Sequence, residues 1–202
     1  MRLTSDQRDA VTEVINVGVG RAAASLSEML GRRIELRVPS VSLCDSRRLR
    51  SRVEQEDAGV DLSVLQDFSG ELSGRALLAF PKRSGIELGK ALGELDGVAE
   101  ELSFDLVGVL EEVGNIVLNG VLGTVGNMTH TRLNYSVPRL AQGAELAQVL
   151  APQATDSGSE DQLVVLADTL FTVADGSIDG SLILLFDIES LRAILDNLMQ
   201  PA

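Results

Sequence analysis

The segment "DAVTEVINVGVGRAAASL", residues 9–26, decides the fold because its pattern returns later in the chain. Its apolar residues recur at the spacing of a helix that buries one face. Glu13 and Asn16 interrupt this pattern three residues apart, so both project from the same side of the predicted helix. Such a pair is either part of a solvated edge or a set of functional groups that act on one object. This segment alone leaves both interpretations open.

A second segment, "LEEVGNIVLNGVL" at residues 110–122, repeats the carboxylate and the carboxamide. Both copies follow one pattern of Glu, two residues, Asn, twenty-two residues and Pro, and the copies are 99 residues apart. Random placement at this composition predicts about 0.01 such matches, so composition does not account for two of them. The pattern consists of Glu13, Asn16 and Pro39 in the first copy and of Glu112, Asn115 and Pro138 in the second.

The predicted secondary structure also follows one order in both halves. In the first half we expect a helix between the capping-box residues 4–7 and Gly31, a strand over 33–39, a hairpin over 60–80 and a helix over 81–95. In the second half we expect a helix over 101–126, a strand over 131–138, a short helix over 144–152, a hairpin over 161–186 and a helix over 188–199. The hairpins match at an offset of 106, so seven extra residues enter the second half, and the polar loop over 154–161 is the expected place.

This repetition predicts an α+β fold. We expect a tandem pseudo-two-fold repeat of a helix–strand–hairpin–helix unit, with the strands in one shared, largely antiparallel sheet and the helices packed on it. Residues 1–202 are predicted to form a single domain of two intertwined repeats, about 1–98 and 99–202. Each Glu–Asn pair is expected on the exposed side of its long helix.

The charge of the chain restricts its partners. The formal net charge is -13 and the pI is about 4.4, which argues against binding to nucleic acid, whose phosphates would be repelled. A partner with a basic surface, or one that brings its own cation, suits this acidic chain better than nucleic acid does. Cys44 is the only cysteine, so an intrachain disulfide is excluded. The N-terminus lacks the apolar stretch of a secretory signal, and no membrane insertion is expected, so we expect a cytoplasmic protein.

The polar pair suits positioning rather than covalent chemistry. A carboxylate and an amide do not make a strong nucleophile, and His130 is the only histidine, so neither a Ser–His–Asp set nor a histidine metal cluster is present. An Asn can orient a water molecule, and a Glu can pair with a cation on a partner. Such a pair can hold water in line with a phosphoryl group that another protein has already activated.

Asp9 lies four residues before Glu13, and with Asn16 and Pro39 these residues resemble the active-site signature of the CheC/CheX/FliY family of chemotaxis phosphatases. Within that family the chain is most similar to CheC. The signature is Asp or Ser, three residues, Glu, two residues, Asn, twenty-two residues and Pro. In the second half Gly108 occupies the Asp/Ser position. The resemblance spans essentially the whole chain, since a CheC-like protein is itself a tandem repeat with two pseudo-symmetric sites.

The resemblance implies a phosphatase that acts on the aspartyl phosphate of a CheY-type response regulator. Glu13 and Glu112 would pair with the regulator's active-site Lys, and Asn16 and Asn115 would orient the attacking water. Asp9, Pro39 and Pro138 would support these catalytic residues. The regulator would supply the Mg²⁺, so this chain is expected to bind no cofactor of its own. A CheD-like protein is a possible second partner.

Two expectations remain beside this one. Related flagellar-switch proteins share the fold and bind partners without hydrolysis, so a non-catalytic binding module is the alternative. Gly108 removes whatever Asp9 contributes one turn before its Glu, and Gly lowers helix stability by roughly 1 kcal/mol relative to Ala. On this ground alone, the second helix is expected to be looser and the first site to dominate if the sites differ.

Overall fold

The computed structural model describes residues 4–31, 33–45, 61–92, 103–149, 163–173, 176–186 and 188–198. The polar loop predicted over 154–161 lies outside them. The elements, in chain order, are α1 (Ser5–Leu30), β1 (Ile34–Asp45), β2 (Leu62–Gly70), β3 (Gly74–Phe80), α3 (Lys82–Ala91), α4 (Phe104–Thr129), β4 (Leu133–Tyr135), β5 (Arg139–Gln142), α5 (Gly143–Val149), β6 (Leu163–Val173), β7 (Gly176–Phe186) and α6 (Ile188–Leu198).

The strands form one sheet in the order β1-β6-β7-β3-β2-β4, and β5 also pairs with β2. Every pairing among the described strands is antiparallel. The predicted α+β fold with a shared antiparallel sheet is therefore confirmed. Strand β1 from the first half pairs with β6 from the second, while β4 and β5 pair with β2. This exchange favours the interpretation of two intertwined repeats, 1–98 and 99–202, in one domain.

The two long helices start and stop at equivalent residues. Both α1 and α4 are 26 residues long, and each boundary of α4 lies 99 residues after that of α1. Thr4 forms a capping box with Gln7 at the start of α1, and Ser103 accepts a 3.2 Å hydrogen bond from the Leu106 amide at the start of α4. The ends are left-handed at Gly31 (φ 61°) and His130 (φ 55°). The single histidine is thus an exposed helix cap.

Both motif prolines lie where the sheet edge is interrupted. The prediction that the first strand ends at Pro39 is wrong, because β1 continues to Asp45 with a register shift between Arg37 and Ser40. Proline has no N–H to donate, and a bulge accommodates it without ending the strand. In the second half the same place separates β4 from β5, and Pro138 lies between them. The sequence pattern did not predict β5.

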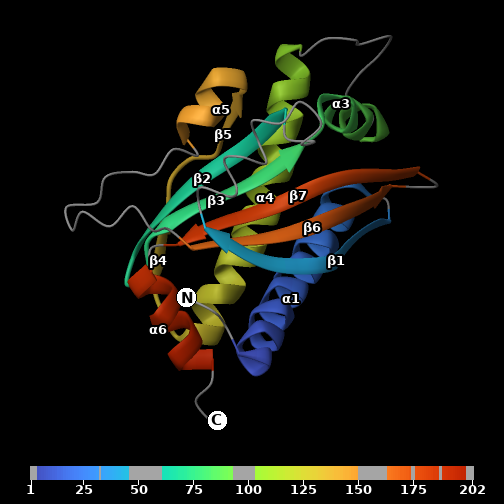
Figure 1. Cartoon of the computed structure of the whole chain (residues 1–202). Helices are drawn as coiled ribbons and strands as arrows, with labels where there is room; N and C mark the ends of the chain where they lie inside the picture. The colour runs from blue at the N-terminus through green and yellow to red at the C-terminus, as the bar shows by residue number, and fades with distance from the viewer. Residues whose placement is uncertain are drawn as a thin grey trace.

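Helices α1, α3, α4 and α6 cover one face of the sheet in a single layer (Figure 1). Helices α1 and α4 cross behind the strands, with α3 and α6 toward opposite ends, and the main core lies between this layer and the sheet. A second, smaller apolar cluster lies on the other face, where Leu146 of α5 packs with Leu65 and Leu77. Because α1 and α4 bury their inner faces in the main core, their outer faces are left for polar side chains.

Helices α1 and α4 approach each other closely. A Cβ atom on Gly18 would lie 2.7 Å from the Cα atom of Val121, and one on Gly120 would lie 3.0 Å from the Cβ atom of Ala22. The Arg21 guanidinium on α1 also donates a 3.2 Å hydrogen bond to the Thr124 hydroxyl on α4. The crossing therefore requires small side chains and fixes the two helices against one another.

The apolar composition of α4 follows from its place in this core. Among the described residues, α4 is the one helix long and apolar enough to cross a membrane, with a mean hydropathy of 1.4. Its buried side chains include Leu106, Leu110, Val117 and Val121, which belong to the core cluster shared with α1 and the sheet. A helix packed between a sheet and another helix is apolar for that reason.

A glutamate side chain connects helix α4 to strand β5. The Glu111 side chain accepts a 2.9 Å hydrogen bond from the backbone amide of Leu140 in β5, and this contact is partly buried. Glu112, the next residue, is exposed. The two neighbouring carboxylates therefore differ in their surroundings, because, within the described part of the chain, Glu111 and not Glu112 bonds to the strand that follows Pro138.

The helix crossing predicts that Gly18 and Gly20 respond differently to substitution by Ala. Replacing Gly18 by Ala would force a Cβ atom against the backbone of α4, whereas a Cβ atom on Gly20 would meet nothing within 4 Å. Overpacking costs about 1–3 kcal/mol and an open helical Gly→Ala change stabilises by up to about 1 kcal/mol. We expect Gly18→Ala to have a free energy of unfolding about 2 kcal/mol below that of Gly20→Ala in urea titrations. Equal values would contradict the close approach.

The neighbouring carboxylates give a second matched comparison. Glu111→Ala leaves the partly buried Leu140 amide without its acceptor, which is expected to lower the free energy of unfolding by about 1–3 kcal/mol. Glu112→Ala removes an exposed side chain and is expected to change it by less than about 0.5 kcal/mol. Urea titrations of both variants measure the difference. If Glu112→Ala were the more destabilising change, Glu112 would be a structural residue.

Candidate functional site

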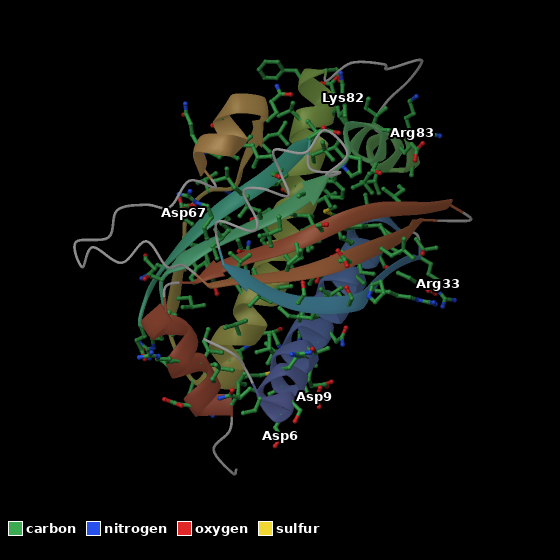
Figure 2. The ribbon with its side chains drawn as sticks, in the orientation of Figure 1. Asp6, Asp9, Arg33, Asp67, Lys82 and Arg83 are labelled. Carbon is green, nitrogen blue, oxygen red and sulfur yellow. The ribbon has the colours of Figure 1, made fainter. Side chains whose placement is uncertain are left out.

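The first Glu–Asn pair lies on the outer face of α1. Glu13 and Asn16 are exposed, while Val14 and Ile15 on the other face are buried in the core. Asp9 is also exposed, one turn before Glu13, and Figure 2 shows it near Asp6 at the N-terminal end of α1, pointing away from the sheet. The structure thus brings the three predicted helical residues of this motif together on one exposed stripe.

The second pair occupies the equivalent place on α4. Glu112 is exposed and Asn115 is half-buried, and Glu112 lies nine residues after the N-cap Ser103, as Glu13 does after Thr4. Gly108 is exposed within the helix, and a Cβ atom there would meet nothing within 4 Å. The missing side chain therefore leaves open space on the stripe and no distortion in the helix.

The two pairs form two separate surfaces. Helices α1 and α4 run in opposite directions where they cross (Figure 1). The N-terminal half of each helix carries its pair, so the pairs lie toward opposite ends of the helix layer. The two pairs are therefore separate in position, as expected for the two pseudo-symmetric sites that the resemblance implies.

Each motif proline follows its long helix, Pro39 within β1 and Pro138 in the gap between β4 and β5. Pro39 is exposed at the bulge of β1, and the start of β1 is tied to α1 by a 2.9 Å hydrogen bond from the Ile34 amide to the Ser27 hydroxyl. Pro138 is half-buried between β4 and β5. Each long helix is therefore hydrogen-bonded to a strand beside its motif proline, α1 to β1 through Ser27 and α4 to β5 through Glu111.

Ser136, two residues before Pro138, is bonded to β2 through its carbonyl, its amide and its hydroxyl. The Gln66 amide donates a 2.9 Å hydrogen bond to the Ser136 carbonyl, and Gln66 is buried beneath the helix layer. The Ser136 amide donates to the Asp67 carbonyl at 2.9 Å, and the Asp67 amide donates to the Ser136 hydroxyl at 3.0 Å. These bonds fix the backbone that leads into Pro138.

A residue that sequence reasoning missed contacts Asn115. The side-chain amide of Asn119 donates a 2.7 Å hydrogen bond to the side-chain carbonyl of Asn115, one turn earlier on α4. The Oδ1 atom of Asn119 is buried and has no hydrogen-bond partner among the described residues. At the matching place in α1 the chain has Gly20, which is exposed. The sequence feature that could have predicted this contact is the i, i+4 spacing of the two Asn residues, at which helical side chains meet.

Charged side chains at the start of β1 form ion pairs with one another. On β1, hydrogen bonding from Arg37 and the nearby charge of Arg33 hold the pKa of the Glu35 carboxyl below its usual value. Within the described part of the chain, no group of three or more His, Cys, Asp or Glu side chains is placed to hold a metal ion. Each site offers a carboxylate and an amide, which can pair with a cation and orient a water molecule.

Known proteins match this chain both in the motif and over its length. Residues 7–43 match the model of the CheC-like family. The flagellar motor switch phosphatase FliY of Bacillus subtilis is 22% identical over a 203-residue alignment that covers 98% of this chain and 50% of that protein. The CheY-P phosphatase CheC of the same organism is 27% identical over 142 residues, 69% of this chain and 68% of that one. The chain thus spans half the length of FliY.

Solved structures extend the similarity to the whole fold. FliY of Thermotoga maritima superposes with a TM-score of 0.70 at 17% identity, covering 98% of both chains. The FliM middle domain of H. pylori superposes with a TM-score of 0.66 at 9% identity, covering 96% of this chain and 99% of that one. At such identities these matches establish the fold alone. The resemblance to the CheC/CheX/FliY proteins is therefore confirmed, through the family model at the first motif and through the fold along nearly the whole chain.

Proposed function

We propose that the chain is a phosphatase that accelerates hydrolysis of the aspartyl phosphate on a CheY-type response regulator. One observation carries the proposal: two Glu–Asn pairs occupy the same outward-facing position on two helices whose boundaries differ by 99 residues. Polar Glu and Asn side chains on the outer face add little to the apolar core, so the repeat of their position is better explained by a task at the surface. The names of the relatives, FliY and CheC, support a phosphatase.

The glutamates provide recognition in this proposal. Glu13 and Glu112 are exposed acceptors on a chain of net charge -13, and each would form a charge-assisted hydrogen bond with the active-site Lys of the regulator. A charge pair at a newly formed interface loses its water and gains strength relative to the same pair in solvent. The carboxylate therefore contributes mainly to binding and to the orientation of the regulator over the helix.

The asparagines provide alignment of the nucleophile. Asn16 and Asn115 lie one turn after each Glu on the same face, so they meet the same region of a bound regulator. A carboxamide that accepts from a water proton holds that water in line with the phosphorus atom, which lowers the entropic part of the barrier. The regulator would contribute the phosphoryl group and its Mg²⁺, and no cofactor on this chain takes part. Asp9, Pro39 and Pro138 would support the two surfaces.

An exposed aromatic side chain gives the second site a further means of docking. Phe104 is 97% exposed and lies eight residues, or about two turns, before Glu112 on the same stripe of α4. The equivalent residue of α1 is Ser5. Aromatic residues are enriched in protein interfaces. Phe104 would therefore add apolar contact with a regulator bound at the second site only.

The alternative is a non-catalytic binding module of the flagellar-switch type. The similarity in fold to the FliM middle domain favours it, and it would use the same exposed stripes to dock a regulator or another protein. A CheD-like partner also remains a prediction from the resemblance. Substitution of the asparagines distinguishes catalysis from docking, since a water-orienting amide matters for hydrolysis and much less for binding.

The asparagines give the first test. Receiver domains from the same genome, charged with acetyl phosphate and Mg²⁺, are assayed for phosphate loss with and without this protein. Asn16→Ala combined with Asn115→Ala is expected to lower kcat by about 10²-fold with KM nearly unchanged. Glu13→Ala combined with Glu112→Ala is expected to lower kcat and also to raise KM by about tenfold, because a charged contact with the receiver is lost. Wild-type protein that binds a receiver and leaves its dephosphorylation rate unchanged would support the binding module instead.

Phe104 gives a test of the docking asymmetry. With the first site disabled by Glu13→Ala and Asn16→Ala, Phe104→Ala is expected to raise KM by about five- to tenfold and leave kcat unchanged, because it removes apolar contact remote from the phosphoryl group. With the second site disabled by Glu112→Ala and Asn115→Ala, the same change is expected to have no effect. A similar loss at both sites would mean that Phe104 acts through the fold rather than through docking.

A further inference from the structure

The two sites differ one turn after their asparagines. Asn119 follows Asn115 on α4, and Gly20 follows Asn16 on α1. Side chains on a helix lean toward its N-terminus, so a residue at i+4 reaches back over residue i. Asn119 uses this geometry to donate its 2.7 Å hydrogen bond to the Asn115 carbonyl. Gly20 has no side chain, so Asn16 lacks the corresponding contact.

The contact restricts the carboxamide of Asn115. The terminal torsion of an Asn side chain is broad, and an exposed amide samples many orientations. A hydrogen bond to its carbonyl oxygen selects one orientation and leaves the NH₂ group and the second lone pair of the oxygen directed elsewhere. Asn115 is half-buried, whereas Asn16 is exposed. The amide of the second site is therefore more ordered than that of the first before any partner binds.

The fold does not require an amide at this place. Gly20 at the equivalent position of α1 is compatible with a helix of the same length and with the same crossing. Asn is a weak helix former, and the Oδ1 atom of Asn119 is buried without a partner among the described residues, which is unfavourable. An amide that contributes little to folding, and that contacts the second-site Asn through its donor group, is better explained by an effect on that Asn.

We propose that Asn119 is a positioning residue of the second site, which holds the Asn115 carboxamide in the orientation that aligns the attacking water. The inference rests on the phosphatase function proposed above. It opposes the effect expected from Gly108, since Gly108 is expected to weaken the second site on the side of Glu112, whereas Asn119 orders it on the side of Asn115. The asymmetry between the sites is then set on both sides of the Glu–Asn pair.

Kinetics in the 202-residue chain test the role of Asn119. The first site is disabled by Glu13→Ala and Asn16→Ala, and hydrolysis is measured with the acetyl-phosphate-charged receiver that responds most strongly to wild type. Asn119→Gly and Asn119→Asp are each expected to lower kcat about three- to tenfold with KM unchanged, the factor for ordering one side chain. Asn119→Asp keeps the size and removes the donor. Asn127→Ala, which removes an exposed Asn from the same helix, is the control and is expected to leave kcat unchanged.

The reverse change tests sufficiency. A Cβ atom on Gly20 would meet nothing within 4 Å, so α1 has space for the side chain. With the second site disabled by Glu112→Ala and Asn115→Ala, Gly20→Asn is expected to raise kcat of the first site about threefold or more. Gly20→Ala, which changes only helix propensity, is expected not to raise it. An unchanged kcat in Asn119→Gly and Asn119→Asp, with wild type active, would overturn the positioning role and leave the proposed function intact.

The order of the amides is measured without any substrate. Nitrogen-15 relaxation of the side-chain NH₂ groups in the free protein is expected to show higher order for Asn115 than for Asn16. Asn119→Gly is expected to bring Asn115 to the level of Asn16, and Gly20→Asn is expected to raise the order of Asn16. Equal order of Asn115 in wild type and in Asn119→Gly would contradict the inference, even if no receiver were dephosphorylated and the proposed function had failed.

Discussion

The close approach of α1 and α4 is the constraint on which the rest of the structure depends. Gly18 lies against the backbone of Val121, and Gly120 against Ala22, so the two helices share one layer over the sheet. Each helix buries its inner face in the common core and turns its outer face to solvent. The crossing therefore determines where both Glu–Asn pairs lie: outward, on antiparallel helices, and toward opposite ends of the layer.

The exchange of strands connects this helix layer to the sheet. Strand β1 pairs with β6 across the two halves, and β4 and β5 pair with β2. Each motif proline lies on one of these exchanged strands or beside it, at a bulge in the first half and between two short strands in the second. Glu111 and Ser27 tie the strands to the long helices. The site elements of each half are thus held by pairing with the other half.

Internal repetition made much of this predictable from the sequence. The offset of 99 residues predicted two equivalent helices, and their observed boundaries differ by that number. The strand end at Pro39 was predicted wrongly, because a proline removes one donor and the sheet edge absorbed that loss in a bulge. The four-residue strand β5 was missed, because so short a segment carries little periodicity. The Asn115–Asn119 spacing was visible, but the burial that distinguishes Asn119 from Gly20 depends on tertiary packing.

Two equivalent surfaces on one chain predict that two receiver domains bind to it, and the number bound per chain tests this arrangement most directly. A receiver domain held in its active form by beryllofluoride and Mg²⁺ is titrated calorimetrically into the 202-residue chain. Two docking surfaces predict two receivers per chain, and Glu13→Ala with Asn16→Ala, or Glu112→Ala with Asn115→Ala, is expected to weaken one of the two binding events about tenfold and leave the other unchanged. A single receiver per wild-type chain, or two binding events of unchanged affinity after either pair of substitutions, would contradict the assignment of one docking surface to each Glu–Asn helix.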